Sequence, residues 1–457
     1  MKTELDLKTD NTTKIFWKFA IPSILIMILQ STAGFIDSMF IGKYVGSNGL
    51  AAVTLVSPII MLLAGIGTMV AIGGTTLSGI FKGKGDIEKS NNFFNVTIVL
   101  LTIISIFATI FVLIFGKSFG LWMGAEGEVV IYVRDYSTTL SLFFVPFLLN
   151  FVMGFFLKLD AKPLAAVIPI ALGTILNIVL NYIFIVYMEL GIKGAALATG
   201  LAQLIPFSML LLELIFKSNW KFKKPIFYKN EVLQMLFNGS SELLSMASVS
   251  ISAFIYNMII INKIGLNGVA AYAVAIQIGN LSIGMFYGLA ESVQSAISVN
   301  YGANQFKRVK ELKNLALKSN FISGLFIFLV VLIFRENIAM IFVSDKSTIE
   351  LSMFIMNFFG FAYIFSGINI SFATYYTSLN SPIISGGITV YRSLISLIAG
   401  LLILPLIFGT NGIWAATIFS EITSVIVAYL CYKKWPFGLK EKNKIINETE
   451  IICKLAN

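Results

Sequence analysis

Long apolar runs recur along this chain and limit what it can fold into. A helix that crosses a bilayer needs about 20 consecutive, mostly apolar residues. Such runs predict twelve membrane-spanning helices, at about 15–41, 50–80, 92–116, 132–157, 164–187, 193–216, 233–262, 269–299, 316–334, 350–377, 383–407 and 411–432. Because 57% of the residues are hydrophobic and only 12% are charged, we expect no sizeable water-soluble domain. The predicted fold class is an all-α integral membrane protein.

The basic residues are distributed unevenly between alternate loops. If both termini are inside the cell, 25 of the 33 lysines and arginines fall in inner segments and 7 in outer ones, while Arg392 lies within a span. This asymmetry predicts the N-in/C-in orientation. It also accounts for the net charge of +10 without a nucleic-acid partner.

The residues that enzymes and metal sites need most often are scarce here. The chain has no histidine, and its two cysteines, Cys431 and Cys453, lie near the C-terminus. The lack of histidine excludes an HExxH zinc site and a Ser-His-Asp triad. The two cysteines predict neither a disulfide framework nor a metal site. We therefore expect a non-enzymatic protein without a cofactor.

The chain also repeats itself at a nearly constant spacing. The first three of four matching pairs of segments share one offset in sequence position, and the offset of the last is shorter by a single position. The pairs are GLAAVTLV (49–56) with GVAAYAVA (268–275), FKGKGDIEK (81–89) with NYGANQFKR (300–308), AKPLAA (161–166) with NSPIIS (380–385), and GIKGAALATGLAQ (191–203) with GTNGIWAATIFSE (409–421). An even number of spans in each half gives both halves the same orientation. The repeat therefore predicts two six-helix lobes related by a pseudo-two-fold axis along the membrane normal, an arrangement typical of transporters.

The repeat and the spans together predict the domain organisation. An N-lobe is expected over residues 1–216 and a basic cytoplasmic linker over 217–232. A C-lobe is expected over 233–435, followed by a cytoplasmic C-terminal tail over 436–457.

Several motifs resemble those of a known family. They are Pro22 with IDSMFIG (36–42), GLAAVTLVSP (49–58), ILNIVLNYIFI (175–185), GIKGAALAT (191–199), ESVQSAISVNYGANQFKRVKE (291–311) and GIWAATIFSE (412–421). Together they resemble the MATE (multidrug and toxic compound extrusion) transporters, in particular the bacterial MepA-like branch, over about residues 14–435. The resemblance implies twelve helices in two lobes that form a V. It also implies export of amphipathic, often cationic, organic molecules from a bacterium across its cytoplasmic membrane, in exchange for Na⁺ or H⁺, by a monomer surrounded by lipid.

Asp37 is a carboxylate inside the first predicted span. An ionisable residue within the membrane is a functional candidate by default, because its charge is costly there. The resemblance implies that this acid holds the coupling cation together with polar groups of spans 5 and 6, which are Asn177, Asn181 and Thr199 in this chain. Asn177 and Asn181 are four residues apart and therefore share one helix face.

This candidate cation site departs from the family pattern at one position. Many MATE transporters carry a second acid where this chain has Asn181. A single carboxylate can still bind Na⁺ with the help of amide and carbonyl oxygens, although more weakly, or it can take up a proton. The sequence leaves both ions open, and also leaves open that Asp37 is only a structural hydrogen-bond acceptor. The repeat aligns Asp37 with Tyr256 and Asn181 with Gly400, so the second half lacks the same set of residues.

Other residues within the spans are candidates for the substrate cavity. Acidic side chains attract cationic substrates, methionines adapt to varied shapes and aromatic faces attract organic cations. The predicted cavity residues are Glu242, Glu291, Gln294, Tyr256, Met61, Met69, Met285 and Tyr287. Glu421 is expected to be structural, and either Glu421 or Glu291 can pair with Arg392.

The hypothesis is alternating access driven by a cation that binds at Asp37. Binding would neutralise the acid and let the first helix rearrange near Pro22 or Gly34, which are the predicted hinge. One alternative is a flippase for lipids or lipid-linked glycans, but such a protein needs cationic residues for phosphate, and Arg392 alone meets that need in the spans. An intramembrane enzyme is the alternative of another class, and the lack of histidine counts against it.

Overall fold

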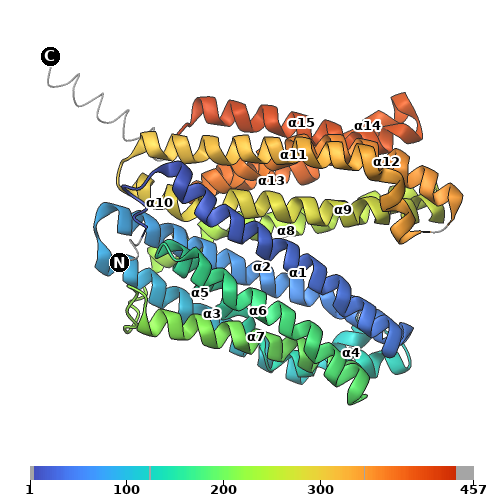
Figure 1. Ribbon diagram of the computed structural model, residues 1–457, viewed down its shortest axis with the longest axis horizontal. Helices are drawn as coiled ribbons and strands as arrows, with labels where there is room; N and C mark the ends of the chain where they lie inside the picture. Colours follow the sequence, from blue (N-terminus) through green and yellow to red (C-terminus); the bar gives the residue numbers. More distant parts are fainter. Residues whose placement is uncertain (1–4, 123–124, 344, 439–457) are drawn as a thin grey trace. The chain divides into compact units, whose positions relative to one another are not determined.

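The chain folds into long helices joined by short loops (Figure 1). The computed structural model describes residues 5–122, 125–343 and 345–438, so most of the predicted tail, including Cys453, lies outside the described residues. In chain order the elements are α1 (Thr12–Tyr44), α2 (Ser47–Lys84), α3 (Ile87–Trp122), α4 (Glu128–Ser141), α5 (Phe144–Leu159), α6 (Pro163–Asn181), the π-helix η1 (Tyr182–Tyr187), α7 (Gly191–Phe216), α8 (Lys229–Lys263), α9 (Leu266–Glu291), α10 (Gln294–Gly302), α11 (Phe306–Phe342), α12 (Lys346–Ser378), α13 (Pro382–Val390), the π-helix η2 (Tyr391–Ser396), α14 (Leu397–Phe408) and α15 (Thr410–Lys434).

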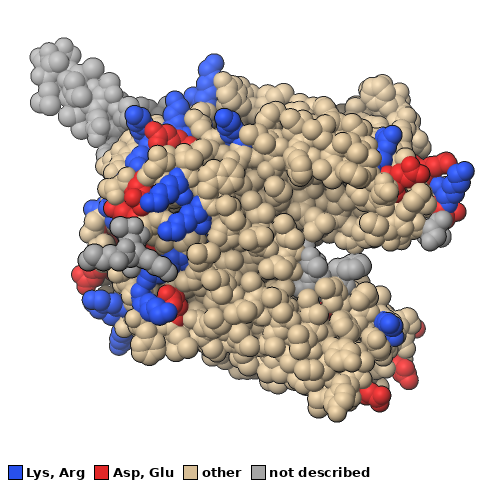
Figure 2. Space-filling view, viewed as in Figure 1, with Lys and Arg blue, Asp and Glu red and all other residues tan. Residues whose placement is uncertain are grey.

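The helices are long and apolar because a bilayer offers the backbone no water. Each peptide group there must find its hydrogen-bond partner within the helix. Eleven helical segments of the described chain are long and apolar enough to cross a membrane, and the bent pair α4–α5 makes a twelfth if it is one span. Figure 2 shows the matching charge pattern, with Lys and Arg near helix ends and few charges along the middle. The all-α fold class and the twelve spans are confirmed.

The fourth span is broken, although the sequence predicted one continuous helix over 132–157. The axes of α4 and α5 differ by 50°. Pro146 lies in the first turn of α5 and has no N–H to donate to the carbonyl of Leu142 four residues earlier. The α-helical hydrogen-bond pattern is interrupted at Leu142 and Phe143, and the missing N–H contributes to this interruption, although α1 and α2 continue through Pro22 and Pro58.

The repeat found in the sequence is present in the backbone of both halves. Residues with a positive φ are rare except for glycine, because a Cβ is strained there. Positive φ values recur in pairs: Gly46 (92°) and Gly265 (94°), Gly85 (86°) and Asn304 (58°), Ala161 (60°) and Asn380 (55°), Gly191 (55°) and Gly409 (58°). Each pair occupies equivalent positions of the repeat, with the same offsets as the matching sequence segments. The loops of the two halves thus turn in the same way even where their side chains differ.

The chain divides into two compact units, each described here by itself. Unit 1 contains Ile21–Gly239 and the start of the chain up to Asp10, and unit 2 contains Asn11–Ala20 and the chain from Ser240 onward. The divisions before Ile21 and before Ser240 fall at equivalent positions of the repeat. They lie inside α1 and α8, so each of these helices belongs to both units. The lobe boundaries drawn from the sequence stay predictions, as does the hinge, since α1 is one uninterrupted helix through Pro22.

Within unit 1, α2 and the first turns of α8 meet at two glycines. A Cβ added to Gly73 would collide with the backbone carbonyl of Met235, and one added to Gly239 would collide with that of Met69. Small residues of this kind let membrane helices approach closely, so that packing replaces the hydrophobic effect that lipid does not supply. The close approach of α2 and α8 therefore depends on both glycines.

We expect Gly239→Ala to lower the free energy of unfolding by about 1–3 kcal/mol, because the added methyl overpacks the crossing. Thermal unfolding of the purified protein in detergent measures the change. Gly387→Ala in α13 is the matched control, because a Cβ at Gly387 meets no atom within 4 Å. Equal unfolding temperatures for the two variants would contradict this account of the crossing.

Candidate functional site

Unit 1 brings the four predicted cation-site residues together. Asn181 Nδ2 donates to Asp37 Oδ1 at 2.7 Å, and it lies 3.4 Å from Asn177 Oδ1. Asn177 Nδ2 in turn donates to Thr199 Oγ1 at 3.4 Å. A hydrogen-bonded chain therefore runs from α1 through α6 to α7.

Helix geometry explains the position of the two asparagines. Asn177 and Asn181 face the same side because four residues separate them on α6. Asn181 is fully buried, and the π-helix η1 starts at the next residue, Tyr182. Such wider turns are frequent at functional sites. The last α-helical residue of this span thus presents its amide to Asp37.

The structure adds Tyr136 of α4 to this site. Its side chain is buried, its hydroxyl is hydrogen-bonded to Thr199, and it lies within electrostatic range of Asp37. A buried tyrosine hydroxyl usually needs a hydrogen-bond partner. This general expectation is the only reason the sequence offers for considering Tyr136. The chain has 16 tyrosines, and the sequence does not show which of them are buried, so it does not single out Tyr136.

The hydrogen bonds around Asp37 are incomplete. The carboxylate accepts one side-chain hydrogen bond, from Asn181, and among the described residues no lysine or arginine forms an ion pair with it. Asn181 Oδ1 is buried and has no hydrogen-bond partner in the described part of the chain. A buried polar atom without a partner is unusual in a native structure. Carboxylate, amide and hydroxyl oxygens meet here, and this donor set suits a hard cation or a proton.

The buried acid of unit 2, Glu421, has different surroundings from those of Asp37. Arg392 in η2 directs its guanidinium at Glu421 of α15, with Nη2–Oε1 at 2.6 Å and Nε 2.9 Å from both carboxylate oxygens. Ser366 and Asn369 of α12 also donate to this carboxylate, each at 2.7 Å. Glu421 is therefore the partner of Arg392, and its charge is compensated on several sides.

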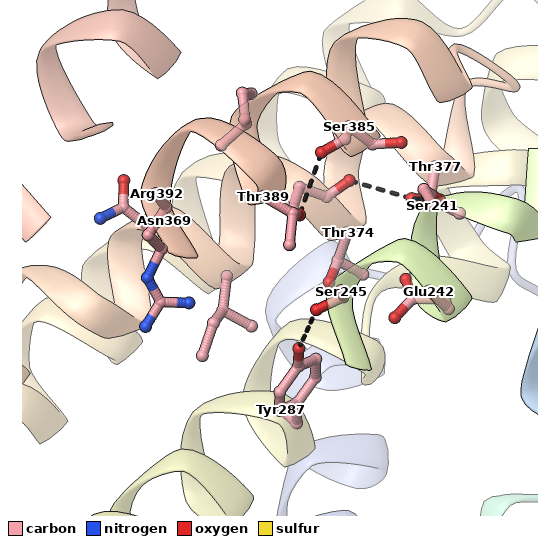
Figure 3. Close-up of a pocket in the computed structure, with 13 residues that line it drawn as sticks. Ser241, Glu242, Ser245, Tyr287, Asn369, Thr374, Thr377, Ser385, Thr389 and Arg392 are labelled. Atoms are coloured by element: carbon pink, nitrogen blue, oxygen red, sulfur yellow. Dashed lines mark hydrogen bonds between the residues drawn. The ribbon is translucent and has the colours of Figure 1, made fainter. Parts of the chain in front are cut away.

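The same unit holds a small polar pocket (Figure 3). Its volume is about 10 Å³, roughly the room that one water needs. Two predicted cavity residues, Glu242 of α8 and Tyr287 of α9, line it together with Arg392, and Glu242 and Arg392 lie on opposite sides in the view. The Tyr287 hydroxyl lies 3.3 Å from that of Ser245. The pocket is small and charged on two sides.

The structure places Tyr256 elsewhere. It is 2% exposed in the apolar core of unit 2, with its ring stacked 4.9 Å from that of Tyr272. Its hydroxyl donates to the Ile413 carbonyl at 2.6 Å and lies 3.1 Å from Thr417 Oγ1. Its ring and hydroxyl are thus occupied within the core, and it does not line the pocket described above. The repeat aligns Tyr256 with Asp37 by sequence position only, and this alignment does not imply that Tyr256 has a similar role.

The other predicted cavity residues are spread over three helices. Glu291 ends α9 and Gln294 begins α10, and Gln294 is 5% exposed. Met285 is half-buried on α9. On α2, Met61 is exposed, and Met69 is half-buried next to the glycine crossing. None of these residues lines the unit 2 pocket, and their role in substrate binding stays a prediction.

Twelve spans on a repeated topology, with a polar site buried inside unit 1, define a polytopic membrane transporter. The chain belongs to the MatE family, because the sequence model of that family matches residues 22–183 and 243–402. The two matched segments end at equivalent positions of the repeat, so each half of the chain carries one copy of the family's sequence pattern.

Known proteins of this kind are similar over almost the whole chain. The multidrug export protein MepA of Staphylococcus haemolyticus (strain JCSC1435) is 23% identical over 433 residues, which are 92% of this chain and 93% of that protein. A crystal structure of MATE in complex with MaL6 has a TM-score of 0.89 at 22% identity. So does a multidrug resistance MATE family transporter of the MOP superfamily in an outward-facing conformation; each alignment covers 95% of this chain and 98% of the other. The fold is therefore that of MATE transporters.

Loss of one partner of the buried ion pair should destabilise the protein strongly. We expect Arg392→Gln to lower the free energy of unfolding by about 3–5 kcal/mol, because Glu421 would keep a buried charge without its cation. The double variant Arg392→Met/Glu421→Leu should lose less, since neither charge remains.

Thermal unfolding in detergent measures both changes. Arg134→Gln is the control, because it removes an arginine from an exposed pair with Asp135 and should change the free energy of unfolding by at most about 1 kcal/mol. If Arg392→Gln and Arg134→Gln had the same effect, the buried pair would not have the structural importance assigned to it.

Proposed function

We propose that this chain is a cation-coupled exporter of amphipathic, often cationic, organic molecules from a bacterium across its cytoplasmic membrane. Its membership of the MatE family and its similarity to proteins named for multidrug export support this function. The coupling ion is Na⁺ or H⁺, exchanged against the substrate by alternating access. The protein acts as a monomer in the N-in/C-in orientation that its basic loops favour.

The proposed coupling role of Asp37 rests on one observation, the difference between its surroundings and those of Glu421. Both acids lie in membrane-spanning helices, but their charges are compensated to different degrees. Among the described residues, Glu421 has an arginine and two further side-chain donors, whereas Asp37 has the single amide of Asn181. A carboxylate in a surrounding of low dielectric constant that lacks a fixed cation gains stability from a mobile one.

The oxygen atoms around Asp37 fit either ion. Asn181 Oδ1 is a buried acceptor without a partner among the described residues, and it belongs to the residue whose amide already contacts Asp37. A bound Na⁺ would be held by Asp37 and Asn181, with Asn177 and Thr199 adjacent, and would supply the positive charge that the carboxylate lacks. A proton on Asp37 would neutralise the same charge without these oxygens. Asn181 in place of a second acid makes the site less negative, which disfavours tight binding of Na⁺.

The transport cycle follows from the state of this carboxylate. When Asp37 binds its cation, α1 no longer carries a net charge at this depth, and its position relative to α6 and α7 becomes free to change. Pro22 and Gly34 are the proposed points at which α1 bends. The substrate would contact Glu242, Glu291 and the methionine and aromatic side chains predicted for the cavity, which attract organic cations.

A flippase for lipids or lipid-linked glycans is less well supported. It would need free positive charge inside the spans to bind phosphate. Arg392 is the candidate for that role, but its guanidinium is already directed at Glu421.

We expect Asp37→Asn to reduce drug efflux to nearly the level of liposomes without protein. The assay is efflux from proteoliposomes with a pH gradient and a Na⁺ gradient imposed separately, and the gradient that drives the parent protein identifies the ion. Glu213→Gln is the matched control, because Glu213 lies in α7 but is paired with Lys217 at 3.0 Å. Undiminished efflux by Asp37→Asn under that gradient would rule out its coupling role.

Asn181→Asp should strengthen cation binding. The concentration of the driving ion that gives half-maximal efflux should fall at least about tenfold, because a second charge a few Å from the ion contributes several kcal/mol at an effective dielectric constant of about 20. Asn257→Asp in α8 is the control, since among the described residues that asparagine bonds only to the Ala253 carbonyl of its own helix. An unchanged or higher half-maximal concentration for Asn181→Asp would contradict a cation site at these residues.

A further inference from the structure

The segment that connects α7 to α8 is fixed against unit 1. Two asparagines at the start of α3 bind its backbone as a neighbouring strand would. Asn91 Nδ2 donates to the Lys221 carbonyl at 2.7 Å, and Asn91 Oδ1 accepts from the Lys221 amide at 2.7 Å. Asn92 makes the same pair of bonds with Ile226, both at 2.9 Å. We call residues 217–228 the strap.

A third asparagine completes this attachment one helical turn later. Asn95 is 4% exposed, and its Nδ2 donates to the Lys221 carbonyl at 3.0 Å, while its Oδ1 accepts from the Lys223 amide at 2.9 Å. Its spacing of four residues from Asn91 puts both on one face of α3. The backbone of the strap is therefore held at three points although it has no regular secondary structure.

The first residues of the strap are anchored separately. The buried carboxylate of Asp160 accepts from the Asn219 amide at 3.1 Å and from Asn219 Nδ2 at 2.9 Å. Trp220 is buried, and its indole N–H donates to the Phe156 carbonyl at 2.9 Å. These contacts order the segment from the end of α7 onward.

The outward face of the strap is basic and apolar at the same time. Lys221, Lys223 and Lys224 are all exposed, and in the described part of the chain no carboxylate forms an ion pair with them. Large apolar side chains follow them in the strap and are also exposed, with Ile226 at 57% and Phe227 at 50%. Exposed apolar side chains next to basic ones on an ordered segment indicate an interaction site rather than a surface that only contacts water.

The acids near the strap are already occupied. Glu213 pairs with Lys217 at 3.0 Å, and Glu231 pairs with Lys89 at 2.7 Å. Asp160 lies within 3.6 Å of Lys82 and 3.5 Å of Lys162. The three exposed lysines therefore present positive charge that these neighbours do not cancel.

We propose that the strap is a binding site for the headgroups of anionic phospholipids. It joins the end of one membrane-spanning helix to the start of the next, so the chain itself keeps it at the membrane surface. Lysines near that surface are attracted to anionic lipids, and aromatic side chains favour the headgroup level. The three asparagines hold the binding face in place before the lipid arrives, which lowers the entropy cost of binding. In the N-in orientation this surface is that of the inner leaflet.

The test uses the full-length protein in nanodiscs of phosphatidylcholine that contain a minor share of spin-labelled phosphatidylglycerol. Electron paramagnetic resonance measures its association constant relative to spin-labelled phosphatidylcholine. In Lys221→Gln/Lys223→Gln/Lys224→Gln this relative constant should fall about tenfold or more, because each surface lysine contributes a factor of about five.

The matched control is Lys307→Gln/Lys310→Gln/Lys318→Gln, which removes the same charge from exposed positions on α11. Its relative association constant should fall by a clearly smaller factor than that of the strap variant, because these lysines contribute only general attraction to anionic lipid and the strap stays intact. Equal losses in both triple variants would overturn the proposal, because net charge alone would then explain the preference. So would a parent protein without any preference for phosphatidylglycerol, or competition by soluble glycerol phosphate as strong as that by the lipid.

A second variant separates the ordering of the strap from its charge. Asn91→Ala/Asn92→Ala keeps every lysine but removes four of the bonds to the strap backbone. We expect faster trypsin cleavage between Lys221 and Lys224 and a severalfold lower preference for phosphatidylglycerol. Faster cleavage with an unchanged preference would refute a preordered site.

Discussion

The cost of keeping a carboxylate away from water organises both units of this protein. A buried charge is tolerated when a partner of opposite charge or a set of hydrogen-bond donors compensates it. Unit 2 meets this requirement permanently, because Arg392 donates to Glu421 and two donors of α12 complete the arrangement. Unit 1 gives Asp37 only the amide of Asn181 and leaves an adjacent amide oxygen without a partner among the described residues. The charge of Glu421 is thus compensated within the fold, and Asp37 is the acid at which we propose that an exchangeable ion binds.

The two halves therefore have the same backbone arrangement but differ in their buried polar side chains. Their loops adopt the same unusual φ values at equivalent positions, which shows that the repeat fixes the turns and the helix order. Their polar residues have diverged within that frame. Asp37 is matched by Tyr256, which completes an aromatic core, and Asn181 is matched by Gly400. A duplicated fold thus supplies two similar bodies, and single substitutions give one of them the candidate cation site.

Much of the fold could be predicted because apolar length and internal repetition are visible in the sequence. Asp37 and the three residues around it could be named because the chain resembles a family that uses those positions, and the spacing of Asn177 and Asn181 agrees with one helix face. Tyr136 could not, since its role depends on how α4 packs against α7 and no pattern separates it from the other tyrosines. The break in the fourth span lies beside Pro146, but other helices continue through a proline, such as Pro22 in α1, so a proline in an apolar run does not by itself predict a break. The attachment of the strap depends on contacts between residues far apart in the chain, such as Asn91 and Lys221, and no local pattern reveals them.

The division of α1 and α8 between the two units has a mechanical consequence. The chain passes between the two units before Asn11, before Ile21 and before Ser240, and the last two of these points lie inside helices rather than in a loop. In α1 the division lies beside Pro22, where the helical hydrogen-bond ladder already lacks one rung and resists bending least. In α8 it lies beside Gly239, whose backbone is pressed against α2. Bending beside Pro22 would break one backbone hydrogen bond fewer, whereas bending beside Gly239 would also disturb the contact with α2, so the two equivalent connections would not bend equally easily.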